Sequence, residues 1–223
     1  MPLTAKEKSG AEIEPITAGV YVAVCYGLVD LGTHENKVFG GESHKCLVQW
    51  ELPEVRGEFE RDGQKVSLPR AISKRYTLSL SEKANLRKDL ESWRGRKFTA
   101  QELSGFDLKA ILGTVCQLQI VHEQSKTDGH TFATIAAIMA VPKGVARPKP
   151  ENPLAFFAFE EAGAKPELLL GLPEWVQQIV MESREWREAM AGSAAPKSAA
   201  TPVPGATPTG TEGTAGEFDN LPF

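Results

Sequence analysis

The chain has 223 residues, 41% of them hydrophobic and 24% charged, which is the composition of a globular protein that can hold one good core. No segment approaches the roughly 18–20 continuous apolar residues that span a membrane, and residues 1–15 lack the apolar run of a signal peptide. We therefore expect a cytoplasmic protein without a membrane segment, and the net charge is −4.

Alternating apolar and polar residues predict five strands after a flexible N-terminal arm at residues 1–16. The second strand is expected to end at Pro53, and residues 54–66 are predicted to form a charged loop. A short helical turn is predicted at residues 107–112, before the fourth strand. The five predicted strands cover residues 18–31, 44–52, 72–80, 115–123 and 130–141.

A helix is predicted between the third and fourth strands. Ser81 suits the N-cap position, and Gly95 stands where a C-terminal glycine belongs. Leu86, Leu90 and Trp93 recur at helical spacing, so they are expected to form the buried face of this helix.

Five strands with a helix after the third is the order of an OB-fold, a small closed barrel. We therefore predict a mainly β protein whose five-stranded OB-fold barrel covers residues 17–145, although other small barrels and sandwiches share this strand count. An extension at residues 146–191 follows, with one amphipathic helix from Pro173 to about Met190. A stripe of this kind is typical of a face that packs on the barrel or on a second subunit of a homo-oligomer; it contains Trp175, Ile179, Trp186 and Met190.

A tail of two parts is predicted after the extension. Residues 192–216 are almost entirely Ala, Thr, Pro, Gly and Ser, which bury too little apolar surface to offset their ordering entropy, so we expect a disordered linker. Residues 217–223 combine acids, aromatics and a Leu-Pro-Phe ending, the pattern of a tethered tip that a partner binds. This tip resembles that of bacterial single-stranded DNA-binding proteins, which assigns partner docking to Glu217, Phe218, Asp219, Leu221, Pro222 and Phe223.

The residue types that enzymes use are present without a catalytic arrangement. The four histidines are scattered, and no phosphate-binding loop or nucleophile motif occurs. The cysteines Cys25, Cys46 and Cys116 lie in apolar runs without metal-ligand spacing, as buried reduced thiols do. We therefore expect no enzymatic activity, no metal and no cofactor.

Cations beside aromatic residues indicate single-stranded nucleic-acid binding, which needs positive charge along the phosphates and aromatic faces on which bases stack. The overall charge favours this only weakly: residues 1–150 hold 21 Lys and Arg against 18 Asp and Glu, whereas residues 151–223 hold 4 against 11. The candidate nucleic-acid-binding residues are Lys37, Phe39, Lys45, Trp50, Lys74, Arg75, Tyr76, Arg94 and Arg96.

Several candidates have an alternative, structural interpretation. Trp50 and Tyr76 share the apolar side of their strands, so burial explains them at least as well as base stacking. Arg94 stands near the end of the predicted helix, where a cation complements the helix dipole. Lys45 and Arg75 face away from the apolar side, which makes them the strongest candidates for phosphate contacts.

Residues 72–80, 86–96 and 105–108 carry a family resemblance. They resemble bacteriophage single-stranded DNA-binding proteins of OB-fold type, and the resemblance covers roughly residues 18–144. It implies binding without sequence preference during phage DNA replication, recombination and repair in an infected bacterial cell, with replication or recombination enzymes recruited by the tip. Two alternatives remain open: a recombination mediator or annealing protein, and a protein-interaction adaptor that does not bind DNA.

Overall fold

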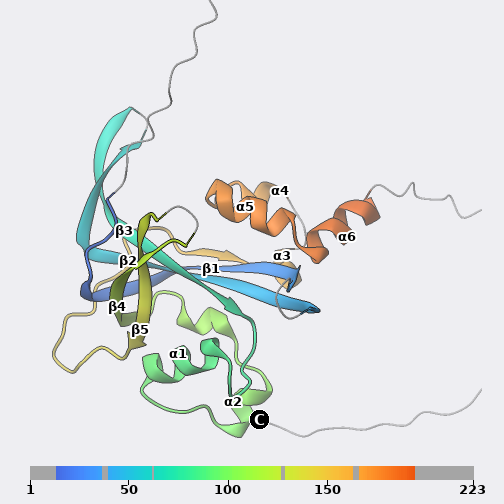
Figure 1. Ribbon diagram of the computed structural model, residues 1–223, viewed down its shortest axis with the longest axis horizontal. Helices are drawn as coiled ribbons and strands as arrows, with labels where there is room; N and C mark the ends of the chain where they lie inside the picture. Colours follow the sequence, from blue (N-terminus) through green and yellow to red (C-terminus); the bar gives the residue numbers. More distant parts are fainter. Residues whose placement is uncertain (1–13, 37–39, 62, 127–128, 163–165, 194–223) are drawn as a thin grey trace, which may run out of the picture.

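A single curled β-sheet organises the part of the chain that the computed structural model describes, residues 14–36, 40–61, 63–126, 129–162 and 166–193. Five antiparallel strands in the order β3-β2-β1-β4-β5 form a half-barrel, and a short sixth strand pairs in parallel with β1 (Figure 1). The strands are β1 (Gly19–Glu35), β2 (Glu42–Arg61), β3 (Gln64–Thr77), β4 (Val115–Gln124), β5 (Thr131–Met139) and β6 (Ala155–Phe157).

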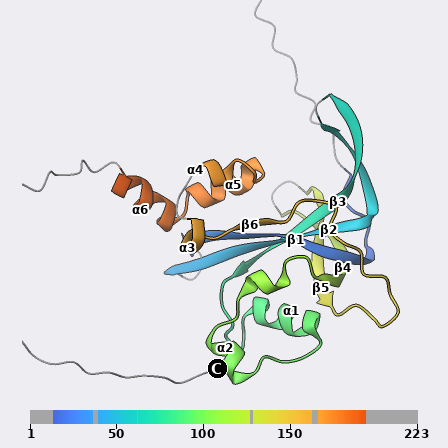
Figure 2. The same cartoon turned by 180° about the vertical axis from the view of Figure 1, so that it is seen from behind.

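Strand β1 is buried on both faces, which explains its nearly continuous apolar sequence. Leu28 faces the main core with its β2 partner Val48, whereas Val29 and Leu31 pack with helices from the C-terminal extension. The helices therefore cover the sheet from two sides (Figures 1 and 2). On one side lie α1 (Asn85–Arg94) and α2 (Ala100–Ser104), and on the other α5 (Glu174–Met181) and α6 (Arg184–Ser193).

Strands β2 and β3 continue beyond the rest of the sheet as a two-stranded arm, so the predicted end at Pro53 and the predicted loop at residues 54–66 are wrong (Figure 1). Pro53 is tolerated because the register of β2 and β3 shifts between Leu52 and Arg56. Pro53 therefore lies in a bulge, where the pairing does not require the backbone N–H that proline lacks. Gly63, with φ of 76°, lies where the arm reverses. In this part of β2, Val55, Gly57 and Phe59 alternate with charged residues, but after Pro53 this alternation is too weak to predict a strand.

The half-barrel has β3 and β5 as its two terminal strands. Among the described residues no register pairs these two strands, although Nζ of Lys74 lies 3.4 Å from the carbonyl oxygen of Ile135. Helix α1 follows the third strand, as predicted, and packs against both β3 and β5. Its predicted face is confirmed, because Leu86, Leu90 and Trp93 are buried in the main core.

The ends of α1 agree only partly with the prediction. Ser81 is not the N-cap: the helix begins after Ala84, whose N–H donates to the Ser81 carbonyl oxygen in a preceding turn. Gly95 ends the helix with φ of 67°, as predicted. The helical turn predicted before the fourth strand is present as a 3₁₀ helix, η1 (Leu108–Ile111).

The main core reaches into the predicted N-terminal arm. Ile16 is only 4% exposed, and its carbonyl oxygen lies 2.8 Å from Nε2 of His122. The arm predicted at residues 1–16 therefore ends before Ile16; residues 1–13 lie outside the described residues.

The C-terminal extension contains two longer helices where one was predicted. The break falls at Ser183, whose Oγ accepts a hydrogen bond of 3.2 Å from the N–H of Trp186 and so caps α6. Two short helices precede them, α3 (Phe159–Ala162) and α4 (Pro166–Leu169). No helix in the described ranges is long and apolar enough to cross a membrane.

The break also changes the buried face of the extension. Val176, Val180 and Trp186 pack against β1 and β2, and their exposed fractions are between 0% and 7%. By contrast, Trp175 and Met190 from the predicted stripe are 45% and 37% exposed. The predicted stripe was partly wrong because it assumed one continuous helix, whereas α5 and α6 are separate helices that turn different faces toward the sheet.

Candidate nucleic-acid interface

Four cationic residues line one pocket at the end of β3, with a volume of about 460 Å³. Three of them, Lys45, Lys74 and Arg75, are predicted candidates that the fold brings together, and the fourth, Lys83, is new. Among the residues that the structure describes, no carboxylate lines this pocket, which we call the cation pocket. Its lining consists of Lys45, Lys74, Arg75, Tyr76, Thr77, Ser79, Ser81, Lys83, Ala84 and Asn85.

Strand pairing places the cations of β2 and β3 side by side. Lys45 lies opposite Thr77 in the register, and its Nζ donates a 2.8 Å hydrogen bond to Thr77 Oγ1. Arg75 is exposed, and no carboxylate in the described ranges pairs with it. Lys74 is different, because its Nζ lies 2.8 Å from Oδ2 of Asp89 in α1, which neutralises its charge in part. The pocket therefore offers free positive charge chiefly at Lys45, Arg75 and Lys83.

The start of α1 adds backbone donors to the same pocket. Ala84 and Asn85 line it, the N-cap makes no side-chain hydrogen bond, and no acid lies in the first turn of the helix. Uncapped N–H groups and the positive end of the helix dipole both favour an anion at this place. Lys83 belongs to the turn just before α1. It was not predicted as a site residue because the predicted helix start at Ser81 placed it inside the first turn of the helix.

The aromatic candidates of the two strands belong to the core. Trp50 is 1% and Tyr76 is 4% exposed, so neither ring is available to stack on a base, and both take the alternative role of core residues. Both side chains point into the half-barrel, where the rings of Trp50 and Trp93 lie 5.9 Å apart. The Tyr76 hydroxyl donates a 2.8 Å hydrogen bond to Asp89, the carboxylate that also binds Lys74. Tyr76 therefore helps to hold β3 against α1.

Arg94 and Arg96 lie apart from the cation pocket. Both pair with Glu102 in α2, and the guanidinium of Arg94 also stacks 4.5 Å from the ring centre of Phe98. Hydrogen bonds from Arg96 and from the Thr99 backbone hold the pKa of Glu102 well below its usual range. These two arginines therefore join the end of α1 to α2 and do not line the cation pocket. The predicted residues Lys37 and Phe39 and the tip at 217–223 lie outside the described residues.

A larger cleft of about 930 Å³ opens on the other side of the segment that links β3 to α1. We call it the apolar cleft, since aromatic and aliphatic side chains form most of its wall. It lies between the half-barrel and the C-terminal extension. Its lining consists of Leu28, Asp30, His44, Cys46, Leu78, Ser79, Leu80, Leu86, Gly105, Phe106, Asp107, Leu108, Lys109, Phe156, Phe157, Ala158, Phe159, Glu160 and Glu185.

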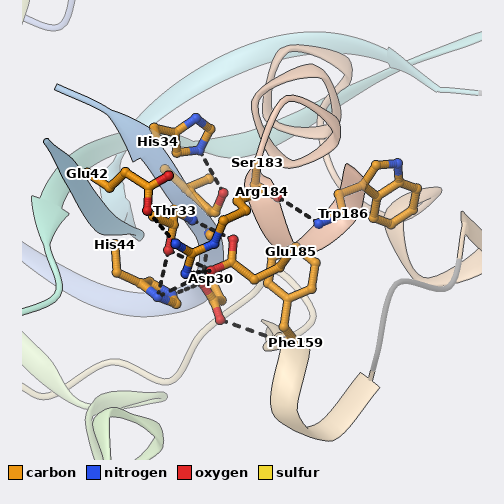
Figure 3. Close-up of polar contacts among 12 residues, drawn as sticks. Asp30, Thr33, His34, Glu42, His44, Phe159, Ser183, Arg184, Glu185 and Trp186 are labelled. Atoms are coloured by element: carbon orange, nitrogen blue, oxygen red, sulfur yellow. Dashed lines mark hydrogen bonds and ion pairs between the residues drawn. The ribbon is translucent and has the colours of Figure 1, made fainter. Parts of the chain in front are cut away.

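A polar network at one end of the apolar cleft ties the extension to the sheet (Figure 3). Glu185 of α6 accepts hydrogen bonds from the N–H and the hydroxyl of Thr33 in β1, at 2.7 and 2.6 Å. His44 of β2 lies between two carboxylates, with Nε2 2.6 Å from Asp30 and Nδ1 3.9 Å from Glu185. Arg184 of α6 also pairs with Glu42 of β2. The network joins α6 to two consecutive strands that lie 142 to 152 positions earlier, so no local motif predicts it.

The stability of the protein is expected to fall as the pH rises through the pKa of His44 in the folded state. Hydrogen bonding to Asp30, with further attraction from Asp30 and Glu185, raises this pKa above its ordinary value, against burial and Arg184. A raised folded-state pKa gives stabilisation that is complete below the unfolded pKa of about 6.5 and is lost as the pH passes the folded one. Urea unfolding across this window should show the decline for the wild type and a flatter profile for His44→Gln. Parallel profiles would contradict the role of His44.

No protein-family model matches the chain, and a comparison with curated proteins found no match. Across the described part of the chain, no group of three or more His, Cys, Asp or Glu residues is placed to hold a metal ion.

Proposed function

We propose that this protein binds single-stranded DNA and that the phosphates lie in the cation pocket. The observation that carries the proposal is the convergence of Lys45, Lys74, Arg75 and Lys83 on the uncapped start of α1, where no carboxylate of the described residues lines the pocket. Lysine, arginine and helix N-terminal N–H groups are all phosphate-binding groups in proteins. None of them reads a base, so this contact predicts binding without sequence preference.

The order of elements supports an OB-type scaffold for this function. The strand order β3-β2-β1-β4-β5, with a helix between β3 and β4, is the order expected of an OB-fold whose terminal strands approach each other. Oligonucleotides bind OB-folds across the second and third strands, and the cation pocket lies at the end of this pair. A role in phage DNA replication, recombination or repair, with partner enzymes recruited by residues 217–223, extends the proposal on the strength of the sequence resemblance.

The first test is a binding panel with labelled oligo-dT, duplex DNA and RNA of equal length, measured by fluorescence anisotropy. We expect the tightest binding to oligo-dT. About three phosphate contacts on a single strand predict a slope near −2 for the logarithm of affinity against the logarithm of salt concentration. An absence of oligo-dT binding at low salt would overturn the proposal and leave the protein-interaction adaptor as the better explanation.

A further inference from the structure

The cation pocket and the apolar cleft lie on the two sides of one rim. Thr77 lines the pocket, the next residue Leu78 lines the cleft, and Ser79 lines both. The rim continues the pairing of β3 with β2, because the N–H of Leu78 donates a 2.8 Å hydrogen bond to the carbonyl oxygen of His44. If a phosphate of single-stranded DNA lies in the cation pocket, the base attached to it can therefore reach the apolar cleft.

The walls of the apolar cleft suit a neutral, flat and apolar group better than a phosphate. Leu78, Leu80, Phe106 and Phe156 supply apolar surface, and Leu78 is 42% exposed. Asp30, Asp107, Glu160 and Glu185 outnumber the cationic residues of the lining, Lys109 and His44, so the cleft repels a polyanion backbone. Its volume of about 930 Å³ lies in the range of natural ligand sites.

We propose that the apolar cleft takes bases of the single strand whose phosphates lie in the cation pocket, an inference that rests on the proposed function. The cleft then supplies the base contacts that the buried rings of Trp50 and Tyr76 do not. The positive charge of the pocket and the negative charge of the cleft orient the DNA. Its phosphate backbone follows the cation pocket, and its bases turn toward the apolar cleft. Apolar contact and stacking accept any base, so this arrangement keeps binding free of sequence preference.

The test measures wild type and Leu78→Asn, each with oligo-dT and with a fully abasic oligonucleotide of the same length and phosphate number. We expect Leu78→Asn to weaken oligo-dT binding about fivefold and to leave binding of the abasic chain unchanged. The matched control is Leu168→Asn, which changes a leucine of α4 with a similar exposed fraction (48%) that lines neither the pocket nor the cleft. It should behave as wild type with both ligands.

The outcomes separate this inference from the proposed function. If Leu78→Asn weakens both ligands equally or neither, or if wild type binds the abasic chain as tightly as oligo-dT, the cleft does not hold bases, while phosphate binding in the pocket stands. If wild type binds neither ligand at low salt, the proposed function fails, and this inference fails with it. Urea unfolding of both leucine variants checks that a loss of affinity does not come from unfolding.

Discussion

Reversing the charges of Arg75 and Lys83 together is expected to reduce the affinity for oligo-dT at least about a hundredfold and to flatten its salt dependence. Both side chains are exposed in the cation pocket, and neither pairs with a carboxylate in the described residues, so both are available to phosphate. The double variant Arg75→Glu/Lys83→Glu removes two attractive contacts and adds two repulsive ones. Because neither residue is buried, the fold should survive the change.

The matched control is Lys143→Glu/Arg147→Glu, which makes the same change in net charge. These residues are exposed in the connector after β5 and lie outside the pocket. Anisotropy titrations at several salt concentrations should give near-wild-type affinity for the control. Equal losses for the two double variants would show that overall charge, rather than the cation pocket, attracts the strand, and the assignment of the pocket would be wrong.

Replacing Gly32 with alanine is expected to loosen the C-terminal extension and to lower the free energy of unfolding by roughly 2–5 kcal/mol, the sum of backbone strain and overpacking. Gly32 has φ of 75°, a region that side chains make unfavourable. A Cβ there would lie 2.5 Å from Cβ of Ser183 and 2.7 Å from Oε2 of Glu185. The added carbon therefore pushes directly on the point where α6 meets β1.

Gly63 offers a control with the same backbone strain and no contact. Its φ is 76°, and no atom of the described residues lies within 4 Å of a Cβ built on it. Gly63→Ala should cost only about 1–2 kcal/mol of unfolding free energy, the strain alone. Urea unfolding measures both variants, and limited proteolysis should cut residues 166–193 faster in Gly32→Ala than in Gly63→Ala. Equal stability and equal cleavage would mean that the close approach of α6 to Gly32 does not hold the extension in place.

The extension is held by interactions that no local sequence pattern signals. Glu51 in β2 is fully buried, and its carboxylate accepts hydrogen bonds from the backbone of Glu151 and from the backbone and side chain of Asn152. A glutamate within a strand looks like a solvent-facing position until the connector is seen to cover it. The same holds for Asp30 and Glu185, whose network joins residues about 150 positions apart.

The candidate interface was predictable in part. Lys45 and Arg75 stand on the side of their strands opposite to the apolar residues, so the partial exposure of Lys45 on β2 and the full exposure of Arg75 on β3 followed from alternation alone. Alternation alone left burial and base stacking open for Trp50 and Tyr76, and the structure places both rings in the core. Lys83 was missed because its position depends on where α1 begins. That start is decided by a turn at residues 81–84 and not by the capping preference of Ser81.

By itself, the sequence determined the positions of the five main strands and the buried face of α1, because spacings of two and of 3.6 residues are local properties of the chain. Only the tertiary structure decided that β2 and β3 extend into an arm, that the C-terminal helix breaks at Ser183, and that four cations share one pocket. These features depend on which segments meet. The exposure of a side chain and the charge around it are set by neighbours distant in the sequence, which no local pattern records.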